Sequence, residues 1–215
     1  STFNRRHGTI TAFIAERDGR PIGRIAAIVN RSHNAYHQDR TGFFGFFECV
    51  NEPAVARALF EKASAVLRAA GLETIRGPYN PSINDDCGVL LNGFDKPTMI
   101  GLPWNPDYYL HLLTDLGFNK ARTLYVMDLA MHRLDPPERF VRIIERLKKR
   151  ANLTMRPFNL TKIEQELEIV RRVYNATLER NWGFVPIGME DLLDSAEDIR
   201  AIADPRLLLI GESNG

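Results

Sequence analysis

The sequence predicts a mixed α/β fold, and three observations support this. Its 215 residues are 44% hydrophobic, which is enough to fill a core. Short apolar segments rich in strand-forming residues alternate with longer segments in which apolar residues recur at helical spacing. Gly, Pro, Asn and Asp stand between them, as is typical of turns. We therefore expect a mixed central sheet with helices on its faces.

The first 130 residues predict most of one such domain. Asp18-Gly19 lies between two apolar segments and is a strong hairpin signal. Pro53 and Gly71 bracket a helical pattern, as a first-turn proline and a terminal glycine do. The expected elements are strands at 9–16, 22–29 and 42–50, a helix at 53–70, a strand at 73–77, a long loop at 78–105, a helix at 106–116 and a strand at 123–129.

The character of the chain changes after Asp135 and two prolines. A charged amphipathic helix at 139–151 follows, then a strand at 153–156, helices at 162–179 and 189–202, and a strand at 207–210. We expect residues 1–133 to form a domain that lacks its N-terminal elements. Residues 134–151 would be a linker helix packed between two units, and 152–215 the opening part of a second domain.

A short repeat favours this division of the chain. The segment from Ile14 to Gly19 has the pattern of Ile210 to Gly215: an apolar residue, then Glu, then a turn that closes on Gly. The two copies lie about one domain length apart. In an alternative topology, strand 153–156 and its helices would fold back to complete the first domain's own sheet beside residues 10–15.

Charge and cysteine content exclude several function classes. Lys and Arg total 28 against 27 Asp and Glu, so the net charge of +1 does not favour a nucleic-acid partner. Cys49 and Cys87 lack metal-ligand spacing, and we interpret both as core thiols of a reducing compartment. No apolar stretch approaches the ~20 residues of a membrane span. The sequence thus predicts a cytoplasmic protein without a membrane partner.

One helix ends in a distinctive way. The segment Tyr108-Tyr109-Leu-His-Leu-Leu-Thr-Asp-Leu-Gly117-Phe118 closes on Gly-Phe before an expected strand. With the hairpin around Asp18-Gly19 and the strand that leads into the helix at 53, this segment makes residues 9–129 resemble the GNAT (N-acetyltransferase-like) acyltransferase superfamily. Residues 153–215 resemble the opening of a second GNAT-like domain. Tandem modules of this kind are also similar to the Fem-type aminoacyl transferases.

The resemblance implies an N-acyltransferase in which an amine attacks an acyl-CoA or aminoacyl donor. Acyl-CoA would be a cosubstrate, and no covalently bound cofactor is implied. The acceptor would be a small-molecule amine or a peptide. In the family, a Gly-rich turn at a helix N-terminus binds pyrophosphate. Here that turn reads Val50-Asn51-Glu52-Pro53-Ala54, where glycine is absent, Pro53 removes one N–H donor and Glu52 adds a negative charge.

The first site is therefore predicted to be degenerate. This leaves an alternative function, in which the first domain is a non-catalytic module for ligand binding or dimerisation, and the protein a homodimer.

Glu48 is the candidate catalytic base, because it lies on the strand where the family often keeps one. Phe43, Phe44, Phe46 and Phe47 precede it, and desolvation by them would make the carboxylate a stronger base. The competing interpretation is a carboxylate at a strand end that pairs with an arginine. The position of the family's tyrosine acid is Leu113, and we expect Tyr109 to be a core residue.

The long loop at 78–105 is the candidate ligand site, since loops of this length are usually functional. Its amides and carboxylate would bind polar groups of a substrate, and its aromatic rings would form flat walls. The candidate substrate-binding residues are Tyr79, Asn80, Asn84, Asp86, Trp104 and Tyr108. Alternatively, the loop's polar side chains cap its own backbone.

His33 and His37 stand four residues apart near Asp39, the spacing that a helix would need to bind a metal. Because no apolar helical face surrounds them, we interpret this segment as a solvated hairpin tip and expect no metal site.

Overall fold

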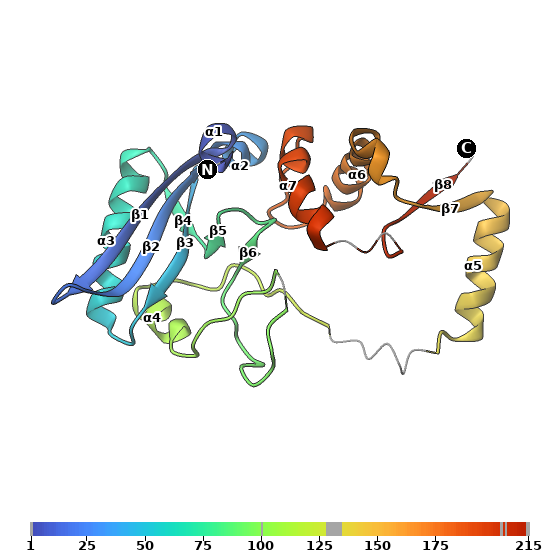
Figure 1. Ribbon diagram of the computed structural model, residues 1–215. Coiled ribbons are helices and arrows are strands. Elements are labelled where there is room, and N and C mark those ends of the chain that lie inside the picture. The colour runs from blue at the N-terminus through green and yellow to red at the C-terminus, as the bar shows by residue number, and fades with distance from the viewer. Residues whose placement is uncertain (1, 100, 128–134, 203, 205, 214–215) are drawn as a thin grey trace. The chain divides into compact units, whose positions relative to one another are not determined.

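The structure is a computed structural model that describes residues 2–99, 101–127, 135–202, 204 and 206–213 (Figure 1). The chain divides into two compact units. Unit 1 contains the chain up to Thr123 together with Asn181–Val185, and unit 2 contains Leu124–Arg180 and the chain from Pro186 onward. Both contain strands and helices, and the predicted mixed α/β class is confirmed.

Unit 1 is built on a four-stranded sheet of order β1-β2-β3-β4 (Figure 1). The first three strands are antiparallel, and β4 runs parallel to β3. Its elements are α1 (Thr2–Arg6), β1 (Gly8–Arg17), β2 (Arg20–Asn30), α2 (Arg31–His37), β3 (Thr41–Cys49), α3 (Pro53–Ala69), β4 (Thr74–Arg76), the two-residue pair β5 (Tyr79–Asn80) and β6 (Asp86–Cys87), and α4 (Tyr109–Asp115).

The predicted hairpin has the geometry that its turn residues favour. Asp18 and Gly19 both have positive φ values, 51° and 72°, as the central residues of a two-residue hairpin turn require. Gly117 likewise takes a φ of 86° at the end of α4. There the N–H of Gly117 donates to the Thr114 carbonyl and that of Phe118 to the Leu113 carbonyl, which is a Schellman cap. The Gly-Phe pair is therefore first of all a helix stop.

The two faces of the sheet carry separate apolar clusters. One face packs against α3 and α4, and its cluster joins Phe44 and Phe47 of β3 to Phe60 of α3. The Phe118 ring lies 5.3 Å from that of Phe44, so the residue after the helix stop joins this cluster. The opposite face holds a smaller cluster, in which Phe43 stacks on Tyr79 with ring centroids 4.7 Å apart.

Residues 31–37 correct one prediction. They form the helix α2, capped by the Asn30 side chain, which accepts a hydrogen bond from the His33 N–H at 2.9 Å. His33 is 2% exposed and meets the edge of Phe43, so the interpretation as a solvated hairpin tip is wrong. The helix is short enough that one buried histidine provides most of its inward face. Within the described ranges, no cluster of three or more potential metal ligands occurs.

The predicted strand at 123–129 is also corrected. Residues 123–127 form no strand, and Tyr125, Val126 and Met127 are strongly exposed. Residues 128 and 129 lie outside the described part of the chain. The last strand of the sheet, β4, is only three residues long and offers little backbone edge for a further strand.

Asn181–Val185 belongs to unit 1 although its neighbours in sequence belong to unit 2. His37 donates from Nε2 to the Phe184 carbonyl at 2.8 Å. The Arg76 guanidinium lies 5.3 Å from the centre of the Trp182 ring, a cation–π distance. These contacts attach the segment to α2 and β4.

Unit 2 contains α5 (Glu138–Arg150), β7 (Leu153–Pro157), a 3₁₀ turn (Leu160–Lys162), α6 (Ile163–Leu178), α7 (Met189–Ile202) and β8 (Leu209–Ser213). Strand β7 pairs antiparallel with β8, whereas the neighbour of β1 is β2. The alternative in which strand 153–156 joins the first sheet beside residues 10–15 is therefore wrong. Asn214 and Gly215 lie outside the described part, so the repeated turn and the exact domain boundaries stay predictions.

Replacing Phe44 with Ala should destabilise unit 1. Phe44 is fully buried among Phe47, Phe60 and Phe118, and removing such a ring typically costs about 3–5 kcal/mol. Urea unfolding followed by circular dichroism measures the loss. The matched control is Phe46→Ala on the same strand, which removes a partly exposed ring and should cost under about 1 kcal/mol. Equal losses in the two variants would contradict this packing.

His33 should make unit 1 less stable in acid. Burial, with a smaller contribution from His37, lowers the pKa of His33 from 6.5 to about 4, and Asp39 opposes the shift. Between these values the unfolded chain binds a proton that the folded chain does not. The free energy of unfolding therefore falls as the pH drops from 6.5 to 4, by roughly 3 kcal/mol at most.

Urea unfolding at a series of pH values checks this prediction. The dependence of the free energy of unfolding on pH should flatten in His33→Gln. It should persist in His111→Gln, which alters an exposed histidine on α4. If the free energy of unfolding falls with pH as steeply in His33→Gln as in the unmodified chain, His33 is not the group responsible.

Candidate functional site

A β-bulge in β3 determines where Glu48 lies. Arg24 pairs with Glu48 and Ala26 with Gly45, so two residues of β3, Phe46 and Phe47, oppose one residue of β2. Phe46 takes a positive φ of 50° at the bulge. In a regular strand Phe44, Phe46 and Glu48 would share one face. The bulge instead returns Phe47 to the face of Phe44 and turns Glu48 away from that core.

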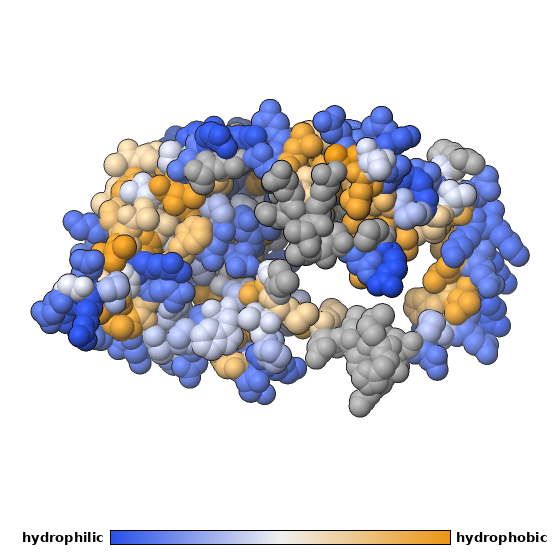
Figure 2. Space-filling view, in the orientation of Figure 1, coloured by the Kyte–Doolittle hydropathy of each residue, from blue (hydrophilic) through white to orange (hydrophobic). Residues whose placement is uncertain are grey.

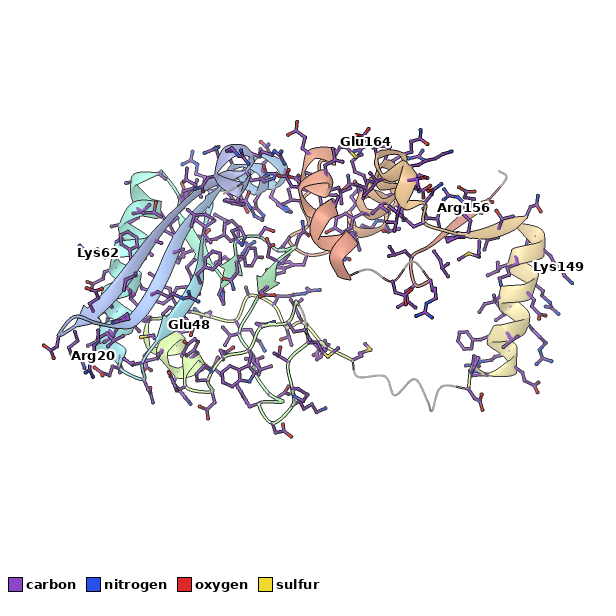
Figure 3. The ribbon with its side chains drawn as sticks, in the orientation of Figure 1. Arg20, Glu48, Lys62, Lys149, Arg156 and Glu164 are labelled. Atoms are coloured by element: carbon purple, nitrogen blue, oxygen red, sulfur yellow. The ribbon has the colours of Figure 1, made fainter. Side chains whose placement is uncertain are left out.

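The expected desolvation of Glu48 is therefore wrong. Its side chain is 58% exposed, and its Oε1 lies 3.8 Å from an Arg24 guanidinium nitrogen on the neighbouring strand. This matches the competing interpretation of a carboxylate at a strand end beside an arginine. Because this pair is well exposed, it adds little to stability. Figure 3 shows Glu48 at the end of β3, next to α4.

Two tyrosines at the start of α4 fix the end of β3. The Tyr109 hydroxyl donates to Glu48 Oε2 at 2.7 Å and accepts from the Cys49 N–H at 3.0 Å. The Tyr108 hydroxyl donates to the Cys49 carbonyl at 2.8 Å. Tyr109 is buried, as predicted. Its contact with Glu48 was not predicted. Tandem tyrosines at a helix start are the sequence signal that points to it.

Burial raises the pKa of both tyrosines, and the nearby Glu48 adds to the effect. Each hydroxyl therefore keeps its proton at neutral pH and acts as a donor. One of the two Glu48 oxygens is therefore held by the Tyr109 hydroxyl, while the other faces Arg24. The arrangement presents an oriented, accessible carboxylate that can accept a proton from a neighbouring group.

Asn80 has a structural role in the bulge. Its Oδ1 accepts a hydrogen bond from the Phe46 N–H at 2.6 Å, and so binds the backbone group that the bulge removes from the ladder. A Cβ on Gly45 would stand 1.7 Å from the Tyr79 carbonyl, so only glycine permits β5 to approach β3 here. Tyr79 itself is buried against Phe43, and burial raises its pKa to about 12. Tyr79 therefore packs in the smaller core cluster, and its place in the wall of a ligand site stays a prediction.

The rest of the predicted ligand loop largely binds itself. Asp85 accepts hydrogen bonds from the Ser82 N–H and hydroxyl, at 3.1 and 2.6 Å. The Asn84 N–H donates to the Ser82 hydroxyl at 3.1 Å. Side chains therefore cap the loop's own backbone, as the alternative interpretation holds. Asn84, Asp86 and Trp104 are exposed, and Asn80 and Asp86 also face each other across the β5–β6 pair.

Of the six predicted substrate-binding residues, Tyr108 lies beside Glu48. Its hydroxyl binds the carbonyl of the next residue, Cys49, and it interacts electrostatically with Glu48. Sequence reasoning missed Asn105, a buried amide at the end of the same loop. Its Oδ1 accepts from the Leu90 N–H at 2.7 Å and its Nδ2 donates to the Pro106 carbonyl at 2.8 Å. Asn105 thus fixes the loop where α4 begins, and its place just before Pro106 is the signal that could have found it.

The N-terminus of α3, where the family's pyrophosphate turn would lie, is already occupied by an ion pair. Arg17 binds the Glu52 carboxylate through both nitrogens, at 3.1 and 2.6 Å. This hydrogen-bonded pair lowers the pKa of Glu52. The N–H groups of Val55 and Ala56 donate to the Glu52 carbonyl, and Pro53 has none. Little donor capacity therefore remains for an anion.

A hollow of about 690 Å³ in unit 2 lies at the junction of β7 and α6. Its lining includes Arg156, Lys162 and Glu166. The guanidinium of Arg156 is already bound to both Glu166 oxygens at 2.8 Å and to Glu212 at 2.9 Å. This hollow therefore lies beside a partly exposed ion-pair junction, in which Arg156 is already paired with two carboxylates.

Two proteins resemble the chain over nearly its whole length. It is 27% identical over 201 residues to Protein YghO of Escherichia coli (strain K12), covering 94% of this chain and 51% of that protein. It is 30% identical over 213 residues to the Bacterial ceramide synthase of Caulobacter vibrioides (strain NA1000 / CB15N), covering 97% of this chain and 54% of that protein. No protein-family model and no solved structure matches the sequence. The chain spans about half the length of the curated relatives it matches.

Proposed function

We propose that the protein to which this chain belongs is an N-acyltransferase that forms an amide on the amine of a long-chain lipid. The observation that carries the proposal is the 30% identity to a bacterial ceramide synthase over 97% of the chain. A ceramide is a long-chain amino alcohol acylated on nitrogen, so its synthesis from that amine is an N-acyl transfer. The mixed sheet and the Schellman-capped helix before Phe118 are consistent with the GNAT resemblance that led to the same reaction class.

In this proposal Glu48 is the catalytic base. An ammonium group loses a proton to the Glu48 carboxylate, and the freed amine nitrogen attacks the carbonyl carbon of a thioester donor. The C–N bond forms, the C–S bond breaks, and the departing thiolate takes up the second proton that the nitrogen loses as it becomes an amide. Tyr109 orients the carboxylate, and Arg24 lies beside its other oxygen. The exposure of Glu48 supports this role, because an acceptor amine must reach it.

The acyl donor is proposed to be acyl-CoA or an aminoacyl carrier, bound elsewhere than the α3 turn. That turn lacks glycine, and its carboxylate and arginine already neutralise each other. The second unit is then proposed to supply the donor site.

A second candidate function is favoured by the same ion pair. If Arg17 and Glu52 close the anion site permanently, unit 1 is a non-catalytic ligand-binding or dimerisation module, and all the chemistry lies in the second domain. The two functions differ in what they require of Glu48.

Replacing Glu48 with Gln in the full-length protein separates them. If Glu48 is the base, kcat for acylation of sphinganine by a long-chain acyl-CoA should fall about 10²–10⁴-fold, with little change in KM. The matched control is Glu73→Gln, which removes another exposed carboxylate that pairs with an arginine, Arg40, at 2.7 Å. Glu73→Gln should keep full activity.

Full activity in Glu48→Gln would assign unit 1 to the non-catalytic role. No product from the unmodified protein with acyl-CoA or aminoacyl donors would overturn the acyltransferase proposal itself. Isothermal titration with acetyl-CoA then shows whether CoA binds at all.

A further inference from the structure

The helix α5 has an apolar face that unit 2 leaves uncovered. Every residue of this 13-residue helix is exposed. Four large apolar side chains are each about half exposed, at 48–56%. They are Phe140, Ile143, Ile144 and Leu147. The spacing i, i+3, i+4 and i+7 puts all four on one stripe that runs about 10 Å along the helix axis.

The other helices of unit 2 behave differently. Helices α6 and α7 share a small core formed by Leu167, Leu192 and Ala196, with Ile163 packed against it. An apolar helix face in this unit is thus normally covered by a neighbour. The described contacts of α5 are with β7, which follows it in sequence, and none of its side chains joins this core. The expected packing of this linker helix between the two units stays a prediction.

The margins of the apolar stripe are basic. The helix holds six basic and two acidic residues, a net charge of +4, while the whole chain carries +1. At 100° per residue, Arg139 and Arg150 lie along one margin of the stripe and Lys148 along the other. The far side of the helix holds both signs of charge: Arg142, Arg146 and Lys149 with Glu138 and Glu145. Figure 2 shows hydrophilic and hydrophobic side chains on different sides of this helix.

We propose that α5 binds the surface of an anionic lipid bilayer, with its apolar stripe among the acyl chains and its basic residues at the headgroups. Charge complementarity selects this partner over a protein surface. Lys148 and Arg150 flank the stripe where long cationic side chains can extend up to phosphates. Basic residues near an anionic membrane each contribute about 1 kcal/mol, whereas a helix packed on protein gains little from its outward charges.

This departs from the expectation of no membrane partner, which rested on the lack of a spanning segment. No helix in the described part of the chain is long and apolar enough to cross a bilayer. A helix that lies in the interface does not need to cross. Its 13 residues and high charge suit the surface rather than the interior. Binding of this kind goes beyond acyl transfer and does not depend on it.

Vesicle flotation with the 215-residue chain tests the proposal without any enzyme assay. The chain should float with vesicles of phosphatidylcholine and phosphatidylglycerol, and far less with phosphatidylcholine alone. High salt should weaken the binding, because the charges are exposed. No flotation with anionic vesicles would overturn the proposal, as would equal binding to both lipids.

Two sets of variants test the apolar stripe and its basic margins. Phe140→Ala with Leu147→Ala should lower the partition coefficient at least about tenfold, since each removes apolar area from the interface. The triple change Arg139→Gln, Lys148→Gln and Arg150→Gln should lower it by about tenfold or more. These side chains are exposed, so circular dichroism should show that the variants stay folded.

Matched controls place the same chemical changes elsewhere. Arg57→Gln, Lys62→Gln and Arg68→Gln remove three exposed charges from α3, a helix whose apolar face is buried. This control should bind as the unmodified chain does. If it loses as much binding as the α5 triple variant, net charge alone explains the attraction and the proposal fails. If sedimentation instead shows a dimer that Phe140→Ala with Leu147→Ala dissociates, the stripe binds a second copy of the chain and the membrane proposal is wrong.

Discussion

The hydrogen bond from the Phe46 N–H to Asn80 Oδ1 is the interaction on which the arrangement of unit 1 depends. It binds the donor that the β3 bulge takes out of the ladder. The bulge reverses the alternation of the strand beyond Gly45. Phe47 therefore completes the core under α3, and Glu48 faces outward. One backbone irregularity thus separates the part of β3 that packs in the core from the exposed end that carries Glu48.

The start of α4 converts this strand end into a site. Tyr109 reaches from the core to both the Cys49 N–H and the Glu48 carboxylate, so the same ring that fills the cluster also orients the carboxylate. Raised tyrosine pKa values keep these hydroxyls as donors. The accessible carboxylate therefore rests on a rigid support, as the proposed role of Glu48 as a base would require.

The elements that could be predicted from the sequence are those that local residues determine. The Asp18-Gly19 turn, the helix between Pro53 and Gly71 and the stop at Gly117-Phe118 depend on residues close in sequence, and all three were predictable. The bulge was not, because Phe43 to Phe47 are all apolar and no periodicity marks the place where the alternation changes. The error over Glu48 followed directly from it. Helix α2 was missed because its inward residue is a histidine, and the strand at 123–127 was wrongly expected because apolar content does not show whether a partner edge exists.

The attachment of Asn181–Val185 to unit 1 has a consequence for how the chain is made. Unit 1 cannot gain the Phe184 and Trp182 contacts until the ribosome has added the chain up to Val185, on the order of seconds after Thr123 at ordinary rates of synthesis. During that interval the nascent first unit holds its sheet and α3 but lacks the segment that covers His37 and Arg76. The final step in the assembly of unit 1 is therefore timed by the synthesis of α5 and α6, which lie between Thr123 and this segment.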